Sequence, residues 1–305
     1  MDLKFYYIFL ICITFCNQIR LLNKQKKIIN VVFAVTNKPI FIDFLLTAIT
    51  SLLVNSNNNT IYNIYIQTDN LFKKENMKLI SNLEKIYFNC FIHFINMNND
   101  FKTALRGKLD ISTYYRLKLP LLYPKINRMI HIDADAIVLK DLMELYTLNF
   151  EGKYILGRLD KLTNELDRLG IMTKTYINCG ILLIDLYNLR KYKYVDKFMD
   201  YLHYHNNPRY LNHHDQTLIN YVCHDKIGLL SPKFHMWPFS GIDSIKEFNN
   251  NLRTKYNEKE FIQAFNDPFI VHFPGSAKKN MSLDTRFYIK FNEYLNKSKE
   301  IKNLM

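Results

Sequence analysis

The sequence predicts an α/β fold in which a mostly parallel sheet carries helices on both faces. Continuous apolar runs at residues 29–35, 61–67 and 90–95 have the length of buried strands. Stretches with helical periodicity at residues 43–54 and 74–87 separate these runs, so this part of the chain alternates strand and helix. Strands that are apolar along their whole length, without polar alternation, indicate a sheet that is buried on both sides.

The rest of the chain extends this alternation. A helix is expected over residues 112–122 and ends there because Tyr123 precedes Pro124, and a residue before proline disfavours helical backbone. The further expected strands lie at residues 128–132, 136–139, 153–159, 178–184 and 269–273. The further expected helices lie at residues 186–205 and 215–222, with a lysine-rich amphipathic helix from residue 284.

The length and composition indicate one continuous globular domain. The 305 residues are 48% hydrophobic and include only eight glycines and eight prolines, which argues against disorder and against a flexible linker. We assign residues 28–283 to this domain and residues 284–305 to a basic C-terminal helix or tail, which either lies on an anionic membrane or solubilises the chain. The formal charge of +13 favours anionic partners, but Asn, Ile, Lys and Tyr are abundant throughout, so we expect no nucleic-acid partner.

An apolar run at residues 5–16 follows Lys4 and precedes a cluster of basic residues. It is shorter than the roughly 20 residues that span a bilayer, and its length suits the hydrophobic region of a signal peptide. We therefore expect residues 1–22 to be a signal peptide or a short signal-anchor, the alternative being a first buried strand. The expected location is the secretory pathway (ER or Golgi lumen) or outside the cell, with membrane anchoring left open. Among the five cysteines there is no C-x-x-C pair, which argues against a structural zinc site.

The sharpest motif is the acid pair Asp133 and Asp135, which lies between two apolar runs. In a regular strand, side chains at i and i+2 share one face, where two carboxylates repel each other and lose hydration. Taken alone, such a pair indicates a solvated turn, but its apolar flanks indicate buried acids, which need a partner. Mn²⁺ or Mg²⁺ meets that need and keeps positions for phosphate oxygens, so a nucleoside diphosphate is the expected ligand. No P-loop and no G-x-G-x-x-G motif is present.

Six motifs in a fixed order give the chain a resemblance to a known family. They are VFAV at 32–35, STYYRL at 112–117, HIDAD at 131–135, YINCGILLID at 176–185, HDQ at 214–216 and VHFPGSAK at 271–278. On these motifs the chain resembles glycosyltransferase family 8, a family of retaining transferases that includes lipopolysaccharide galactosyltransferases and glycogenin. The resemblance covers about residues 28–279 and implies a GT-A fold, with a Rossmann-like, mostly parallel sheet in a single domain.

The resemblance implies that Asp133, Asp135 and His272 ligate Mn²⁺ or Mg²⁺, and that the metal bridges the diphosphate of a UDP-sugar. It places Lys278 as a cation beside the leaving phosphates, while Gly275 lets the backbone approach them closely. A histidine that follows an apolar strand is by itself more often structural, so His272 depends on the acid pair for this assignment.

The resemblance also places four residues around the donor sugar: Arg116, Asn178, Asp215 and Gln216. Asp215 and Gln216 are the implied catalytic residues, Asp215 holding sugar hydroxyls and Gln216 lying near the anomeric carbon. The structural alternatives are a solvated helix residue for Arg116, a turn residue for Asn178 and a helix N-cap for Asp215.

Further substrate contacts are implied at Ala34, Thr36, Asn37 and Ala134. Family members often carry acidic residues after the first strand to hold the uridine, whereas Thr36, Asn37 and Lys38 stand at this place. The neutral amide of Asn37 still offers hydrogen bonds to uracil.

The expected function is a metal-dependent retaining hexosyltransferase that moves galactose or glucose from a UDP-sugar to a carbohydrate, glycolipid or glycoprotein acceptor. The alternatives are a xylosyl- or glycogenin-type transferase of the same family and a catalytically idle GT-A domain that binds a nucleotide or glycan. Because the Gln216 amide is a poor nucleophile, we favour same-face attack over a covalent intermediate. Asp160 is a further candidate contact to the sugar or acceptor. The sugar, the acceptor, the linkage and the oligomeric state are left open by the sequence.

Overall fold

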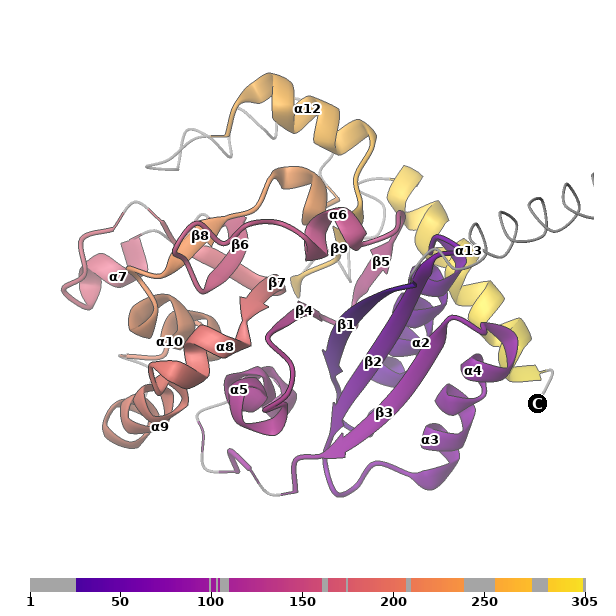
Figure 1. Ribbon diagram of the computed structural model, residues 1–305, viewed down its shortest axis with the longest axis horizontal. Coiled ribbons are helices and arrows are strands. Elements are labelled where there is room, and N and C mark those ends of the chain that lie inside the picture. Colours follow the sequence, from indigo (N-terminus) through magenta and orange to yellow (C-terminus); the bar gives the residue numbers. More distant parts are fainter. Residues whose placement is uncertain are drawn as a thin grey trace, which may run out of the picture.

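The computed structural model describes residues 26–98, 100–102, 104, 110–160, 164–173, 175–206, 210–238, 256–275 and 285–303 (Figure 1). Within this part, a seven-stranded sheet has the strand order β3-β2-β1-β4-β7-β6-β8, and a two-stranded sheet pairs β5 with β9. In the large sheet β7 runs antiparallel to both of its neighbours, while the other neighbouring strands are parallel. The predicted α/β class with a mostly parallel sheet is therefore confirmed.

The strands follow the predicted apolar runs closely. In chain order they are β1 (Lys27–Ala34), β2 (Thr60–Thr68), β3 (Cys90–Asn96), β4 (Arg128–Ile132), β5 (Ala136–Val138), β6 (Ile155–Leu159), β7 (Ile177–Asp185), β8 (Ile227–Leu229) and β9 (Ile270–His272). The sequence analysis missed β8, because a three-residue strand at the sheet edge has no periodicity to detect.

The helices of the described residues connect and cover these strands. In chain order they are α2 (Pro39–Val54), α3 (Lys74–Ser81), α4 (Leu83–Ile86), η1 (Ile111–Lys118), α5 (Leu119–Leu122), α6 (Met143–Tyr146), α7 (Asn164–Arg168), α8 (Leu186–Lys191), α9 (Tyr194–His205), α10 (His214–Val222), η2 (Pro232–Phe234), α12 (Glu258–Asn266) and α13 (Thr285–Asn303).

Several predicted helices differ from the observed ones in their ends or continuity. α2 begins earlier than predicted, because Pro39 occupies its first turn, where the fixed φ of proline suits a helix. The helix predicted at 186–205 is α8 and α9, which are separated because Lys193 adopts a left-handed φ of 55°. The stretch predicted at 74–87 is α3 and α4, and the one at 112–122 is the 3₁₀ helix η1 followed by α5.

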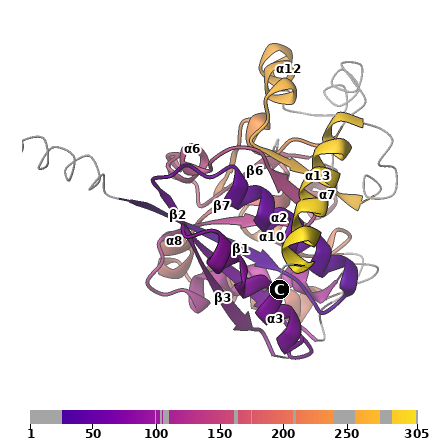
Figure 2. The same ribbon diagram turned by 90° about the vertical axis from the view of Figure 1, so that its right-hand side faces the viewer.

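Apolar side chains fill a core on each face of the large sheet. On one face Ile29, Val31 and Phe33 of β1 pack with α2, and α13 lies beside α2 in both views (Figure 1, Figure 2). On the other face Val32 belongs to a second core, which is completed by η1, α5, α8 and α9. The strands are thus apolar on both sides for the reason predicted.

The basic C-terminal segment is a packed helix rather than a loose tail. Phe291 of α13 meets Phe44 of α2 edge to face, with ring centroids 5.8 Å apart, and Phe287 is also buried. Lys290, Lys297 and Lys299 are exposed. α13 therefore covers the sheet-flanking helix α2 with its apolar residues and presents lysines to solvent, and the two roles expected for this segment stay predictions.

Among the described residues, no helix is both long enough and apolar enough to cross a bilayer. The predicted leader at residues 1–22 lies outside the described residues. Cys90, Cys179 and Cys223 are free thiols in buried positions.

Candidate active site

The two acids of the sharpest motif lie in the turn between β4 and β5. The Asp133 N–H donates to Gly180 O at 2.8 Å, and the Phe273 N–H donates to Asp135 O at 2.9 Å. The argument that both acids share one face of a regular strand was wrong, because the backbone turns here instead of continuing β4. The prediction that they lie at a strand end was correct, and the turn still brings the two carboxylates together.

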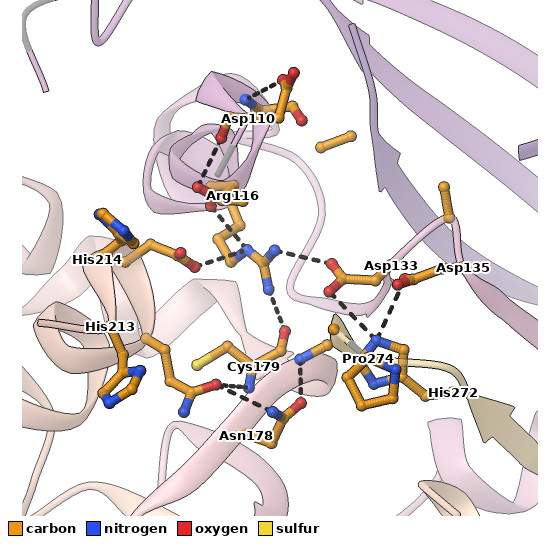
Figure 3. Close-up of a pocket in the computed structure, with 18 of the residues that line it drawn as sticks. Asp110, Arg116, Asp133, Asp135, Asn178, Cys179, His213, His214, His272 and Pro274 are labelled. Carbon is orange, nitrogen blue, oxygen red and sulfur yellow. Dashed lines mark hydrogen bonds and ion pairs between the residues drawn. The ribbon is translucent and has the colours of Figure 1, made fainter. Parts of the chain in front are cut away.

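His272 completes a group of three metal-type donors. β9 pairs antiparallel with β5, which places His272 opposite Ala136 and next to the acid turn. Its Nε2 lies 3.3 Å from Asp135 Oδ1 and 3.7 Å from Asp133 Oδ2, and the donor atoms of the three residues all lie within 4.8 Å of one another (Figure 3). Two carboxylates and one imidazole are a donor set that suits a divalent cation such as Mn²⁺ or Mg²⁺. The residues present therefore fit a metal ion.

Gly180 of β7 makes room for the His272 ring. A Cβ at this position would lie 2.1 Å from His272 Cε1 and 2.6 Å from Nδ1, far inside van der Waals contact. The imidazole thus packs directly on the β7 backbone, and a glycine is required there for close approach.

Arg116 of η1 is the buried cation at the centre of the site. Its Nη2 donates to Asp133 Oδ1 at 2.9 Å, its Nε lies 3.3 Å from Asp215 Oδ2, and its Nη1 donates to Cys179 O (Figure 3). The guanidinium is therefore directed at groups of the protein and bridges the acid of the β4–β5 turn to the acid at the start of α10. The alternative of a solvated helix residue is wrong, since Arg116 is buried.

The shared guanidinium leaves the two acids in different electrostatic states. Burial opposes ionisation of Asp133, yet Arg116, His131 and His272 together hold its pKa well below the usual value. Burial raises the pKa of Asp215 to about 6, because the favourable charge of Arg116 is offset by the negative charge of Asp133. Asp133 is thus a stable carboxylate, whereas Asp215 gains its proton in weakly acidic solution.

Three polar side chains form a hydrogen-bonded cluster beside Asp215. Asn178 Nδ2 donates to Gln216 Oε1 and to Asp160 Oδ2, each at 3.1 Å, and Gln216 Nε2 donates to Asp160 Oδ2 at 3.3 Å. The Cys179 N–H also donates to Gln216 Oε1, at 3.3 Å. Both ends of the Gln216 amide are therefore held; Asp160 lines the same cavity, and its contact to a sugar or acceptor stays a prediction.

These residues line one cavity of about 810 Å³. Ten residues of the predicted site line it: Ala34, Arg116, Asp133, Ala134, Asp135, Asn178, Asp215, Gln216, His272 and Gly275.

Two predicted residues stand apart from the cavity lining, and a third is not among the described residues. Thr36 donates from Oγ1 to Asp110 Oδ2 at 2.9 Å, and Asn37 Oδ1 accepts from Asn76 Nδ2 at 2.8 Å; neither is a lining residue. Lys278 lies outside the described residues.

The structure adds site residues that the sequence analysis did not single out. Asp110 lines the cavity, caps η1 and pairs with Lys38 at 2.7 Å. Burial opposes ionisation of Asp110, but Lys38, the Ser112 N–H and Thr36 together bring its pKa below the usual value. His131 Nε2 lies 3.0 Å from Asp133 Oδ1, and burial lowers the pKa of His131 to about 4. His235 contacts His272 from a loop 37 residues earlier in the chain. Asp110 before Ser112 carried a capping signal, whereas nothing local marked His235.

The comparison with protein families decides the assignment of the chain. The profile of glycosyl transferase family 8 matches residues 12–279. The chain belongs to glycosyl transferase family 8. This family 8 chain is 29% identical to general stress protein A of Bacillus subtilis over 237 residues, covering 75% of this chain and 79% of that protein. It is 25% identical to the lipopolysaccharide 1,2-glucosyltransferase of Escherichia coli over 243 residues, covering 76% of this chain and 67% of that protein.

Solved structures of glycosyltransferases share the fold of this family 8 chain. The galactosyltransferase LgtC, solved in complex with donor and acceptor sugar analogues, aligns with a TM-score of 0.71 at 18% identity, covering 88% of this chain and 96% of LgtC. The apo structure of the bifunctional glycosyltransferase WbbM aligns with a TM-score of 0.69 at 18% identity, covering 92% of this chain. This chain spans 52% of the WbbM chain and 58% of a putative glycosyltransferase of Haemophilus influenzae to which it is 28% identical. The fold is that of the GT-A glycosyltransferases, and the chain is a glycosyltransferase by family.

Proposed function

We propose that this chain is a retaining, divalent-metal-dependent transferase that moves a hexose, galactose or glucose, from a UDP-sugar to a glycan, lipid or protein acceptor. The observation that carries the proposal is the convergence of Asp133, Asp135 and His272 in the same cavity as Asp215 and its hydrogen-bonded neighbours. The names of the relatives support the general chemistry, since they include a lipopolysaccharide glucosyltransferase and a galactosyltransferase.

The acid turn and β9 provide the metal-binding side of this site. Asp133, Asp135 and His272 would hold Mn²⁺ or Mg²⁺, and the bound cation would stabilise the negative charge that develops on the departing diphosphate. Arg116 has a different part: it balances the charges of Asp133 and Asp215 and fixes their positions. Asp135 is 7% exposed, so its carboxylate is held where little water competes for it.

The α10 side of the cavity provides the groups for the sugar. Asp215 is 4% exposed and lines the cavity, so in its ionised form it accepts hydrogen bonds from sugar hydroxyls. Its pKa of about 6 means that this form dominates at neutral pH. Asp160 and Asn178 hold Gln216 in one orientation beside Asp215.

The state of Gln216 favours same-face attack for a retaining reaction. A double displacement needs a strong, preferably anionic nucleophile, whereas the Gln216 amide is neutral; the amide oxygen, oriented by Asn178 and Cys179, still carries a partial negative charge. We therefore assign Gln216 the role of stabilising positive charge at the anomeric carbon, and assign removal of the acceptor proton to the leaving phosphate.

The location of the enzyme stays a proposal that rests on sequence. The apolar run at residues 5–16, followed by basic residues, supports entry into the secretory pathway with or without a membrane anchor.

Release of UDP from a panel of UDP-sugars tests the proposed function. The purified chain is assayed with Mn²⁺ and with EDTA, beside the variant Asp135→Ala. We expect turnover of one hexose donor in Mn²⁺, and its loss both in EDTA and in the variant. Binding of UDP without turnover of any donor would instead favour an idle nucleotide-binding domain, and preference for UDP-xylose would favour the xylosyl alternative.

Asp267→Ala is the matched control for this assay. Asp267 is an exposed acid that pairs with Lys140 away from the cavity, so its loss should leave turnover unchanged. Equal turnover by the wild type and Asp135→Ala would overturn the metal assignment.

A further inference from the structure

A buried hydrogen-bonded row leads from Trp237 to the histidine of the metal-type group. Trp237 Nε1 donates to His235 Nε2 at 3.2 Å, and the same His235 Nε2 lies 2.9 Å from His272 Nδ1. His235 is fully buried and His272 is 2% exposed. The opposite nitrogen of His272, Nε2, is the one that faces Asp133 and Asp135. The row thus ends on His272 Nδ1, and a cation would use the opposite nitrogen of the same ring.

The backbone fixes this row as firmly as the side chains do. The His272 N–H donates to Met236 O at 2.8 Å, and the Met236 N–H donates to Ile270 O at 2.9 Å. The segment that carries His235 and Trp237 therefore runs alongside β9 as an additional short pairing. The Trp237 ring also covers the buried guanidinium of Arg158, whose central carbon lies 3.8 Å from the ring centroid.

Trp237 determines which nitrogen of each histidine carries hydrogen. An indole N–H only donates, so His235 Nε2 must be an acceptor and the hydrogen of a neutral His235 lies on Nδ1. If His272 Nδ1 also lacked a hydrogen, two lone pairs would face each other at 2.9 Å, so His272 Nδ1 must donate and shares the single lone pair of His235 Nε2 with the indole as a three-centre hydrogen bond. When His272 is neutral, its lone pair then lies on Nε2, directed at the two carboxylates, and this is the form that binds a metal.

We propose that Trp237 and His235 are positioning residues that fix His272 as its Nδ1–H tautomer, and so prepare Nε2 to bind a divalent cation. The proposal rests on the metal site of the proposed function. It goes beyond that site because neither residue offers a ligand atom to the three-residue group. The usual partner of a metal-binding histidine is a carboxylate or a carbonyl oxygen, whereas here a second histidine has that position.

Loss of the indole N–H should reverse both tautomers. The present arrangement leaves His235 Nδ1 without a hydrogen-bond partner among the described residues. Without the Trp237 donor, His235 avoids burying an unpaired N–H by moving its hydrogen to Nε2 and donating to His272 Nδ1. His272 then carries its hydrogen on Nε2, which donates to Asp135 and has no lone pair for a metal.

Nitrogen NMR of the metal-free, ¹⁵N-histidine-labelled chain measures the tautomers directly. The signals of His272 are identified by their absence in His272→Gln. The spectra are compared at a pH at which His272 is neutral. We expect the Nδ1–H form in the wild type, and a shift to the Nε2–H form in Trp237→Phe, which keeps an aromatic ring over Arg158 but lacks the N–H. Manganese titration followed by electron paramagnetic resonance should show about tenfold weaker binding by Trp237→Phe.

A pair of substitutions at His235 separates hydrogen bonding from packing. His235→Gln supplies a side-chain oxygen that accepts from His272 Nδ1, so it should keep the Nδ1–H form and most of the metal affinity. His235→Leu supplies no acceptor, so it should lose both the Nδ1–H form of His272 and most of the metal affinity. An unchanged His272 tautomer in Trp237→Phe and in His235→Leu would overturn the proposal. If the wild type binds no Mn²⁺, the metal part of the proposed function fails, while the metal-free tautomers still decide this inference.

Discussion

Substitution of Gly180 by alanine should remove His272 from the metal-type group without disturbing the acids. The added Cβ would lie 2.1 Å from His272 Cε1, and ordinary contact begins at 3.4 Å, so the ring must withdraw by about 1.3 Å. Metal–ligand distances tolerate changes of only about 0.2 Å, so Nε2 leaves the ligand set. Since loss of an outer partner already costs 10–100-fold in metal affinity, we expect at least about 100-fold here, or about 2.7 kcal/mol.

The assay is Mn²⁺ titration by electron paramagnetic resonance, together with urea unfolding to measure stability. Overpacking in β7 should destabilise the fold by about 1–3 kcal/mol, so the variant is expected to remain folded. Gly228→Ala is the control. Gly228 lies in β8, where no site residue lies, and a Cβ added to it would meet Leu156 Cδ2 at 2.5 Å. Gly228→Ala should lower the free energy of unfolding by a similar amount and leave the Mn²⁺ affinity unchanged. Folded Gly180→Ala with the Mn²⁺ affinity of the wild type would refute the reasoning.

Three further predictions concern Arg116, Asp215 and α13. Arg116→Met should lower the free energy of unfolding by about 3–5 kcal/mol in urea, because it leaves the buried Asp215 and the half-buried Asp133 without their cation. Exposed Arg168→Met should cost under about 1 kcal/mol, and equal small losses would contradict the bridging role. Because burial raises the pKa of Asp215 to about 6, kcat/KM should rise with pH through about 6 as the carboxylate ionises, and a pH profile without that step would count against its role. The folded-state pKa of Asp215 lies above its unfolded value near 3.9. Its contribution to the free energy of unfolding is therefore fully present below about pH 3.9 and is lost as the pH rises through about 6. Phe291→Ala should destabilise the chain by about 3–5 kcal/mol in thermal or urea unfolding, because Phe291 is buried against α2. Ile289 is 57% exposed, so Ile289→Ala should cost under about 0.5 kcal/mol, and equal effects of the two substitutions would show that α13 does not pack as described.

The sequence predicted the fold class well because its strands are rich in β-branched and aromatic residues. The run 61–67 consists of isoleucine and tyrosine apart from Asn63 and Gln67, and β2 coincides with it within a residue at each end. The predicted helix boundaries were wrong where the backbone conformation of a single residue interrupts a helix. Lys193, with its left-handed backbone, divides a stretch whose periodicity continues from α8 into α9.

The site was predictable where its residues lie in short segments between apolar runs. Asp133, Asp135 and His272 all adjoin buried strands, so their chemistry stood out from the sequence around them. Asp110 and His235 were missed because their importance comes from partners far along the chain: Lys38 is 72 residues from Asp110, and His272 is 37 residues from His235. Arg116 lines the cavity, and its predicted contact to the sugar stays a prediction; its bridge between Asp133 and Asp215 was not predictable, because these acids come from distant parts of the chain.

Calorimetric titration with UDP, in Mn²⁺ and in EDTA, tests the central claim most directly. The claim is that one cavity holds a divalent cation on Asp133, Asp135 and His272 and a nucleoside diphosphate on that cation. It predicts that UDP binds the wild type in Mn²⁺, and that EDTA or Asp135→Asn each removes most of that binding. Equal UDP affinity in all three conditions would contradict the claim, because the nucleotide would then be held without the metal group.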